Sequence, residues 1–332
     1  MIKAWKISAL AALLMASWGH AEEKLVIYTA RSEQLNNMVI EHFEKDTGIK
    51  TELVVAGTGP LLKRVESEKD NPNGDIFWAA DETMLFAKKD LFDVYISPEN
   101  EHILPQFRNK TGHFSAAFSD PTVFIVNHQS PVKVEGFADL LQPELKGKIA
   151  FGDPANSSSA FQCLMAMLYA HGKNHDPMSE EAWAYVDKFI AQLDGKILNS
   201  SGGVHKGVAD GEYMVGLTWE DPAANYVKNG AKVSVVFPKE GAIFPGESVQ
   251  IIKGSKNKEQ AQRFVDYLLG EKVQNLVGEN LTVRPLREGA KLASYMKPQS
   301  EITLFPNYDE AWVAENKNKI VAEWNKHLED SM

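Results

Sequence analysis

The segment Ser200–Gly230 reads SSGGVHKGVADGEYMVGLTWEDPAANYVKNG, and its pattern predicts how the chain around it folds. Two serines and two glycines precede a short helical pattern, and the apolar run Tyr213–Thr218 is typical of a buried strand. The sequence WEDP at 219–222 then predicts a second helix start, with Asp221 as N-cap and Pro222 at the first helical position. Because helix N-termini present free backbone N–H groups, the segment predicts a site for a polar, anionic small molecule.

The same junction between a strand and a helix start recurs along the chain. Each copy places Ser, Thr or Gly directly after an apolar strand and before a helical pattern. The junctions are Thr29–Ser32, Gly57–Pro60, Asp153–Ser159, Ser200–Val204 and Thr218–Pro222. Strands that alternate with helices predict parallel sheets with helices on both faces, and ligands of such sheets bind beyond the carboxyl ends of the strands.

Two extended stretches interrupt this alternation, and they predict that the chain crosses between two lobes. The strand Thr122–Asn127 leaves the first unit, and the extended region 238–250 returns to it. We therefore expect an α/β protein with two parallel-sheet lobes, a hinge of two crossing strands and a ligand cleft between the lobes. The expected lobe bounds are 22–121 with about 247–290, and 122–246 with about 291–332.

Residues 1–21 have the pattern of a cleavable secretory signal peptide. Lys3 and Lys6 give a basic start, Ile7–Trp18 forms an apolar core, and 19–21 are the small-residue cleavage site Gly-His-Ala. The apolar core is too short for a membrane span. We expect an exported, soluble chain that begins near Glu22 and resides in the periplasm.

The composition excludes several classes of partner and site. The full chain has 35 basic and 45 acidic side chains, and loss of two lysines with the signal peptide leaves a net charge of −12. This acidic balance argues against nucleic acid or an anionic membrane surface as partner, although helix N-termini can still hold a small anion locally. The single cysteine, Cys163, excludes an intramolecular disulfide and a Cys-rich metal cluster, and its apolar surroundings predict a buried thiol.

Five stretches together resemble the periplasmic solute-binding proteins of ABC importers, in the family that includes the ferric-ion-binding proteins. They are LVIYTARSEQ (25–34), ESEKDNPNGDIFWAADE (66–82), LLQPELKGKIAFGDPANSSSAF (140–161), GVADGEYMVGLTWEDPAANYVKNGAKVSVVFPKEG (207–241) and IIKGSKNKEQAQRFVDYLL (251–269). The resemblance covers essentially the whole mature chain. It implies the two-lobed type II binding-protein fold, capture of a small solute by hinge closure, and delivery to an ABC permease in the inner membrane. We expect a monomer without cofactor.

The resemblance also bears on the ligand. In the iron-binding members, a pair of tyrosines follows the strand that matches Met214–Thr218, and a histidine often lies in the first strand-to-helix loop. The matching positions here are Asp221, Pro222 and Ser32. Relatives that lack the tyrosines bind phosphorylated organic solutes, and the sequences SSGGVHKG and TWEDP are similar to those of the hexose-phosphate type. A hexose phosphate such as glucose 6-phosphate or fructose 6-phosphate is therefore the expected ligand.

The expected site residues fall into two groups by chemistry. Phosphate favours N–H groups, hydroxyls and a cation, whereas sugar hydroxyls favour carboxylate or imidazole acceptors. The expected phosphate-side residues are Arg31, Ser32, Thr58, Gly59, Ser157, Ser158, Ser159, Ser200, Ser201 and Gly202. The expected hydroxyl acceptors are His205, Glu220 and Asp221, and Arg284 is a second candidate cation.

Three alternatives stay open at this point. Glu220, Asp221 and His205 could instead hold ferric iron or another metal. The solute could be a different organophosphate or a phosphonate. An exported enzyme on the same architecture is disfavoured, because the chain has no G-x-S-x-G elbow, His-metal motif or phosphate-loop lysine motif, and we expect no catalytic residues.

Overall fold

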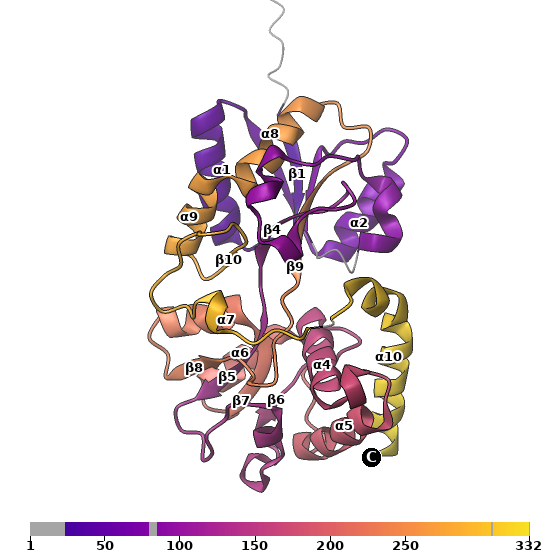
Figure 1. Ribbon diagram of the computed structural model, residues 1–332, viewed down its shortest axis with the longest axis vertical. Helices are drawn as coiled ribbons and strands as arrows, with labels where there is room; N and C mark the ends of the chain where they lie inside the picture. The colour runs from indigo at the N-terminus through magenta and orange to yellow at the C-terminus, as the bar shows by residue number, and fades with distance from the viewer. Residues whose placement is uncertain (1–23, 80–84, 307, 332) are drawn as a thin grey trace, which may run out of the picture.

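The computed structural model describes residues 24–79, 85–306 and 308–331, and the expected signal peptide lies outside these ranges. Two sheets lie one above the other along the long axis of the molecule, and helices surround each of them (Figure 1). The expected two-lobed α/β architecture is therefore confirmed. Within the described part of the chain, no helix is both long and apolar enough to span a bilayer.

The first lobe contains a six-stranded sheet with the strand order β10-β4-β9-β3-β1-β2. Its strands are β1 (Leu25–Thr29), β2 (Thr51–Val55), β3 (Ile76–Trp78), β4 (Ser115–Ser119), β9 (Gly246–Ile251) and β10 (Arg284–Pro285). The helices around it are α1 (Glu33–Thr47), α2 (Thr58–Ser67), α8 (Lys258–Leu269) and α9 (Glu271–Asn280). Strand β1 pairs in parallel with β2 and β3, whereas β9 runs antiparallel to β3 and β4.

The second lobe contains a four-stranded sheet with the strand order β6-β7-β5-β8. Its strands are β5 (Thr122–Asn127), β6 (Ile149–Ala150), β7 (Val215–Trp219) and β8 (Val233–Val236). The helices around it are α4 (Ser158–His171), α5 (Glu180–Leu193), α6 (Ser201–Ala209), α7 (Glu220–Lys228) and α10 (Glu310–Asp330). Strands β6 and β7 are parallel, and β5 runs antiparallel to β7 and β8.

Both sheets are mixed, which corrects the prediction of purely parallel lobes. The strands that lead into helix starts remain parallel, as expected for β1, β2 and β3 and for β6 and β7. The antiparallel partners include the strands that cross between the lobes. Strand β4 leaves the first lobe and β9 returns to it, so the two must run in opposite directions when they pair.

The chain passes between the lobes at both predicted places and at a third. The first two passages join β4 to β5 and β8 to β9. After β10 the chain runs to α10, whose side chains Val313 and Trp324 belong to the core of the second lobe. At the boundary this third segment contacts the second one, because the Ala242 N–H donates to the Thr303 carbonyl at 2.9 Å. The exact lobe bounds given above stay a prediction.

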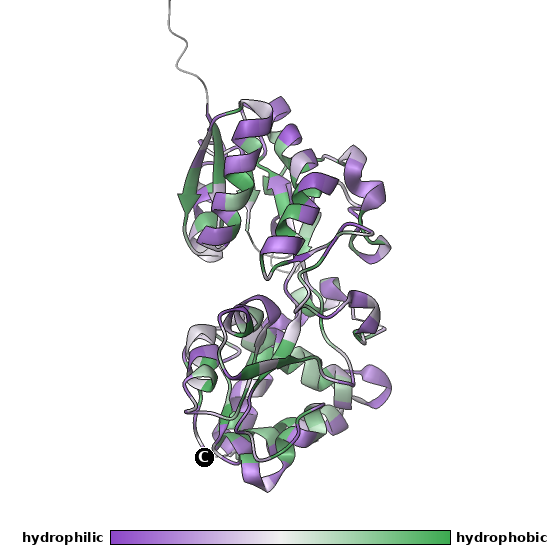
Figure 2. Cartoon of the chain, turned by 90° about the vertical axis from the view of Figure 1, so that its left-hand side faces the viewer, coloured by the Kyte–Doolittle hydropathy of each residue, from purple (hydrophilic) through white to green (hydrophobic). Residues whose placement is uncertain are grey.

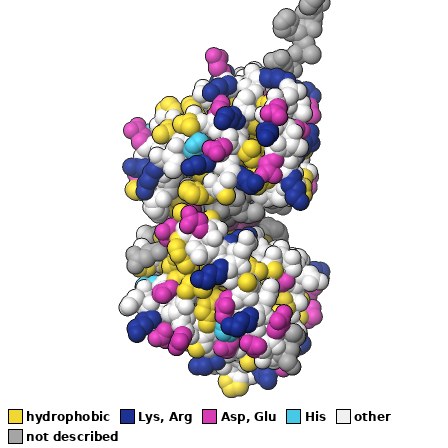
Figure 3. Space-filling model, turned by 90° about the vertical axis from the view of Figure 1, so that its right-hand side faces the viewer, with side chains coloured by type: hydrophobic (Ala, Val, Ile, Leu, Met, Phe, Trp, Pro, Cys, Tyr) yellow, Lys and Arg dark blue, Asp and Glu magenta, His cyan; other side chains and the backbone are white. Residues whose placement is uncertain are grey.

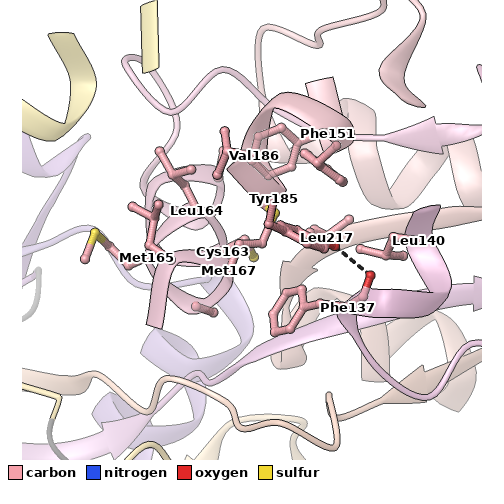
Figure 4. Close-up of a cluster of buried hydrophobic side chains, with 14 of the residues drawn as sticks. Phe137, Leu140, Phe151, Cys163, Leu164, Met165, Met167, Tyr185, Val186 and Leu217 are labelled. Carbon is pink, nitrogen blue, oxygen red and sulfur yellow. Dashed lines mark hydrogen bonds between the residues drawn. The ribbon is translucent and has the colours of Figure 1, made fainter. Parts of the chain in front are cut away.

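Each lobe has an apolar core beneath its helices, and the helices present mixed apolar and polar faces (Figure 2). Helix α4 is the exception, because eleven of its fourteen residues are buried between the second sheet, α5 and α10. Phe137, Phe151 and Leu164 pack in this core with Leu217, and the Tyr185 hydroxyl donates to the Phe137 carbonyl at 2.6 Å (Figure 4). Burial on all sides explains why the α4 sequence is apolar around its whole circumference. It also holds the start of α4 in a fixed place.

Gly216 fixes the position of α6 on the second sheet. A Cβ atom at this residue of β7 would lie 2.8 Å from Val204 and 3.0 Å from Val208, both on α6, and 3.1 Å from Ile125 on β5. Real Cβ atoms essentially never come as close as 2.8 Å to another heavy atom, and contacts of 3.0–3.1 Å are tighter than nearly all that occur. The glycine therefore lets α6 approach the sheet and sets where its first turn lies.

Gly216→Ala is expected to lower the free energy of unfolding by about 1–3 kcal/mol, because overpacking displaces the neighbouring side chains or backbone. Urea unfolding measures this loss. Gly202→Ala, in the exposed first turn of α6, is the control, since an added Cβ there meets only the Ser200 hydroxyl at 3.8 Å. Equal losses in the two variants would contradict this role of Gly216.

Candidate functional site

All five predicted strand-to-helix junctions begin helices, namely α1, α2, α4, α6 and α7. Three of them are capped by their own serine. The Ser32 hydroxyl accepts from the Leu35 N–H at 3.4 Å, that of Ser157 from Ala160 at 3.3 Å, and that of Ser200 from Gly203 at 3.4 Å. These caps leave further N–H groups of each first turn without intrahelical partners, as at every helix start. Thr58 and Gly59 open α2, which has Gly57 as N-cap and no side-chain cap.

The start of α7 differs from the prediction. Its N-cap is Trp219, so Asp221 and Pro222 lie inside the first turn, and the expected Asp221 cap is wrong. The acceptor comes instead from the first crossing, because the Asp221 N–H donates to Asp120 Oδ1 at 2.7 Å. The Glu220 N–H donates to the Pro121 carbonyl at 2.8 Å. The positive end of α7 is thus already occupied by a carboxylate of the chain itself.

The chain segments that lead into α4 and α6 are paired with each other. Just before these helices, the Leu198 N–H donates to the Phe151 carbonyl and the Asp153 N–H donates to the Leu198 carbonyl, both at 2.9 Å. This parallel pairing brings the two chain segments together shortly before Ser157 and Ser200. On α4, Ser157 and Ser159 are buried and their hydroxyls lie 3.0 Å apart, whereas Ser158 is exposed. On α6, Ser201 is half-buried and Gly202 is exposed.

His205, on α6, packs against α7 in the same lobe. Its ring lies 5.7 Å from the ring of Tyr226 on α7, at an interplanar angle of 46°. Nδ1 is buried and has no hydrogen-bond partner among the described residues. Burial lowers the pKa of His205, so the imidazole is neutral near pH 7. Its expected contact with the ligand stays a prediction.

Arg31, Ser32 and Asp221 come together in a pocket of about 170 Å³ between the lobes. Asp120 and Glu247 also line this pocket. The Arg31 guanidinium forms an ion pair with Glu247, which lies on the crossing strand β9. Three acidic side chains and one guanidinium thus line the same pocket. Sequence reasoning missed Asp120 and Glu247, although their places beside the two predicted crossings were a signal that could have found them.

Glu220 and Arg284 form a buried ion pair between the lobes. Their side chains are 2% and 1% exposed, and two hydrogen bonds of 2.9 and 2.6 Å join Nε and Nη2 of Arg284 to the two carboxylate oxygens. Next to this pair, the Thr282 hydroxyl donates to Asp221 Oδ1. In this conformation Glu220 and Arg284 bind each other and are buried, and their expected contacts with a ligand stay a prediction.

The alternative of a metal site would need a cluster of ligating side chains, and the part of the chain that the structure describes contains none. No group of three His, Cys, Asp or Glu side chains there is close enough to hold an ion, and this includes Glu220, Asp221 and His205. A larger groove of about 680 Å³ contains none of the predicted site residues. It is lined by aromatic rings such as Phe107 and Phe305 and by the acidic Asp309 and Glu310, a lining that does not suit a phosphate.

A family model for bacterial extracellular solute-binding proteins matches residues 25–280. The chain belongs to this family. The spermidine/putrescine-binding periplasmic protein of Escherichia coli (strain K12) is 26% identical, over 97% of this chain and 95% of its own length. The periplasmic binding protein AfuA from Actinobacillus pleuropneumoniae, solved with fructose-6-phosphate, has a TM-score of 0.78 at 22% identity, over 92% of this chain and 98% of that one. Apo ferric ion-binding protein A from Pasteurella haemolytica also has a TM-score of 0.78 at 22% identity, over 92% and 97%.

This solute-binding protein is therefore a periplasmic substrate-binding protein of the ABC transporter family, with a small solute and a permease as its partners. Its relatives are transport proteins, not enzymes. These similar proteins are described with a sugar phosphate, ferric ion or polyamines as ligand, so the shared fold does not select among these ligands. On the face shown in Figure 3, acidic and basic side chains are interspersed over both lobes.

Glu220→Ala is expected to destabilise the solute-binding protein by about 3–5 kcal/mol, because it leaves the buried Arg284 charge unpaired. Urea unfolding measures the loss. Glu288→Ala is the matched control, since it removes the partner of Arg108 from a pair in which both side chains are at least one-third exposed. That control should cost no more than about 1 kcal/mol. A loss equally small for Glu220→Ala would show that the pair is not buried in solution.

Asp120→Asn is expected to stabilise the protein near neutral pH, and to do so less as the pH falls to about 4. Burial, followed by the carboxylates of Asp221 and Glu247, raises the pKa of Asp120 well above its usual value. The contribution of such an acid to stability is complete below its unfolded pKa of about 3.9 and is lost as the pH rises through its folded pKa. Asn keeps an oxygen for the Asp221 N–H but cannot ionise. Urea titrations over this pH range measure the difference, and a gain that grows on acidification would contradict the expectation.

Proposed function

We propose that this protein is the periplasmic receptor of an importer for a phosphorylated sugar, a hexose phosphate such as glucose 6-phosphate or fructose 6-phosphate. The lobes close on the solute because it contacts both of them, and the closed receptor delivers it to the inner-membrane permease. The observation that carries the proposal is the start of α6, with its exposed Gly202 and Gly203, together with the serine-rich start of α4, because these two helices follow paired segments of the chain. Two neighbouring helix N-termini with hydroxyl groups suit a phosphate.

The glycines of α6 support a ligand role because packing does not require them. A Cβ added to Gly202 would meet only the Ser200 hydroxyl at 3.8 Å, and one added to Gly203 would meet nothing closer than Leu198 at 3.7 Å. Within a helix, glycine costs about 1 kcal/mol relative to alanine. Two such residues in one first turn, with room for side chains, keep the backbone N–H groups accessible to a bound molecule.

The acidic side chains that line the pocket between the lobes support our assignment of the sugar hydroxyl groups to this pocket. Asp120, Asp221 and Glu247 can accept hydrogen bonds from hydroxyl groups. This pocket does not suit a phosphate dianion, because its acidic side chains outnumber its one guanidinium, which already pairs with Glu247. We therefore assign the phosphate to the α4 and α6 starts and the hydroxyl groups to the acidic pocket.

The same acidic pocket favours a second candidate, a cationic solute. Asp120, Asp221 and Glu247 outnumber Arg31 among its charged lining residues. One relative is named for spermidine and putrescine, which are polyamines. This candidate leaves the glycines of α6 without a role, so we rank it below the sugar phosphate.

A thermal-shift screen of the mature chain separates the two candidates. Glucose 6-phosphate or fructose 6-phosphate is expected to stabilise the protein, since a ligand at 100 to 1,000 times its Kd adds about 3–4 kcal/mol. Glucose, fructose, spermidine, putrescine and ferric citrate are tested in parallel. A shift with spermidine or putrescine and none with either sugar phosphate would favour the cationic candidate.

Gly202→Ala is expected to weaken sugar-phosphate binding about tenfold, which corresponds to about 1.4 kcal/mol, without lowering stability. The added methyl group obstructs approach to the first turn of α6 but meets only the Ser200 hydroxyl, at an unstrained 3.8 Å. Isothermal titration calorimetry measures the affinity. Ser179→Ala is the control, because Ser179 caps α5, which follows α4 after a short turn and begins at its far end. It should cost about 1 kcal/mol of stability and leave affinity unchanged; unchanged affinity in Gly202→Ala would remove α6 from the site.

A further inference from the structure

Helix α7 belongs to the second lobe, yet three of its side chains are bound to the α9–β10 segment of the first lobe. Glu220 pairs with Arg284, and Asp221 accepts from Thr282. At the other end of the helix, Lys228 Nζ donates to the Asn280 carbonyl at 2.7 Å. We call these three contacts the α7 tether. They lie along one edge of the boundary between the lobes, on the left in Figure 1.

Arg284 is anchored on the side of the first lobe. It lies in β10, directly opposite Ser119 in the antiparallel pair with β4. Its guanidinium also lies 5.8 Å from the ring centroids of Phe237 and Phe244, which belong to the second crossing segment. At these distances the guanidinium makes cation–π contacts with both rings. The cation is therefore fixed by both the first sheet and the hinge.

Such a pair is costly to separate. A buried charge that loses its partner keeps the desolvation cost and loses the compensating attraction. Rotation of the lobes that opened this edge would break both hydrogen bonds between Glu220 and Arg284. Rotation that leaves this edge in place would keep the pair intact and let the opposite edge, where α2 and α10 lie, move more freely (Figure 1).

We propose that the α7 tether is a fixed pivot, and that the lobes open and close around this edge of their boundary. Glu220 is then a positioning residue that acts through Arg284 and not a ligand contact. The proposal concerns the ligand-free protein and does not depend on the identity of the solute. Its failure and the failure of the sugar-phosphate proposal can therefore be told apart.

Spin labels on the edge opposite the tether test this pivot. Lys63→Cys on α2 and Asn318→Cys on α10 are exposed positions on different lobes, and the native Cys163 is buried and spared by the label. Double electron–electron resonance on the ligand-free, full-length mature chain measures the distance distribution between the labels. Glu220→Gln keeps the side-chain volume but removes the charge. It is expected to broaden the distribution and to add longer distances.

Two further variants keep the test decisive. Thr282→Val removes only the hydrogen bond to Asp221, and it should broaden the distribution less than Glu220→Gln; it replaces that variant if Glu220→Gln does not fold. Glu99→Gln is the matched control, because its partner Arg287 lies in the same lobe and the pair does not cross the boundary. It should leave the distribution unchanged. An unchanged distribution in the folded tether variants, whatever their melting temperature, would overturn the pivot.

Discussion

Only two residues, Asp120 and Pro121, separate a strand of the first sheet from a strand of the second. This short passage forces the ends of β4 and β5 to lie together at the boundary between the lobes. The backbone there is held from both sides, because the Thr122 N–H donates to the Ile243 carbonyl and the Ile243 N–H donates to the Thr122 hydroxyl, both at 3.0 Å. The start of α7 is bound to the same passage, so the second crossing and α7 are positioned by the first.

The boundary of the lobes consequently satisfies most of its own charges. Asp120 binds the first turn of α7, Glu247 pairs with Arg31, and Arg284 pairs with Glu220. The phosphate of the proposed solute is therefore left to groups of a different kind, the hydroxyls and backbone N–H groups at the starts of α4 and α6. A receptor built in this way would recognise an anion through fixed dipoles, which suits reversible capture and release better than a fully paired salt bridge.

Local signals made the helix starts predictable. Ser32, Ser157 and Ser200 cap helices by accepting from backbone N–H groups three residues further along the chain, and such short-range patterns can be read directly from the sequence. The start of α7 could not be predicted in detail, because its acceptor, Asp120, lies 101 residues from Asp221 along the chain. The partner of Glu220 lies 64 residues away. The polarity of these residues indicated a site at the boundary, but only the fold assigns their partners.

Native mass spectrometry of the receptor purified from its own periplasm tests the central claim most directly. The account predicts a bound solute that, once released and fragmented, yields a phosphate ion and a hexose. The phosphate would identify the anion expected at the α4 and α6 starts, and the hexose would identify the hydroxyl groups expected at the acidic pocket. A bound polyamine, a ferric ion or an unphosphorylated sugar in its place would contradict the account.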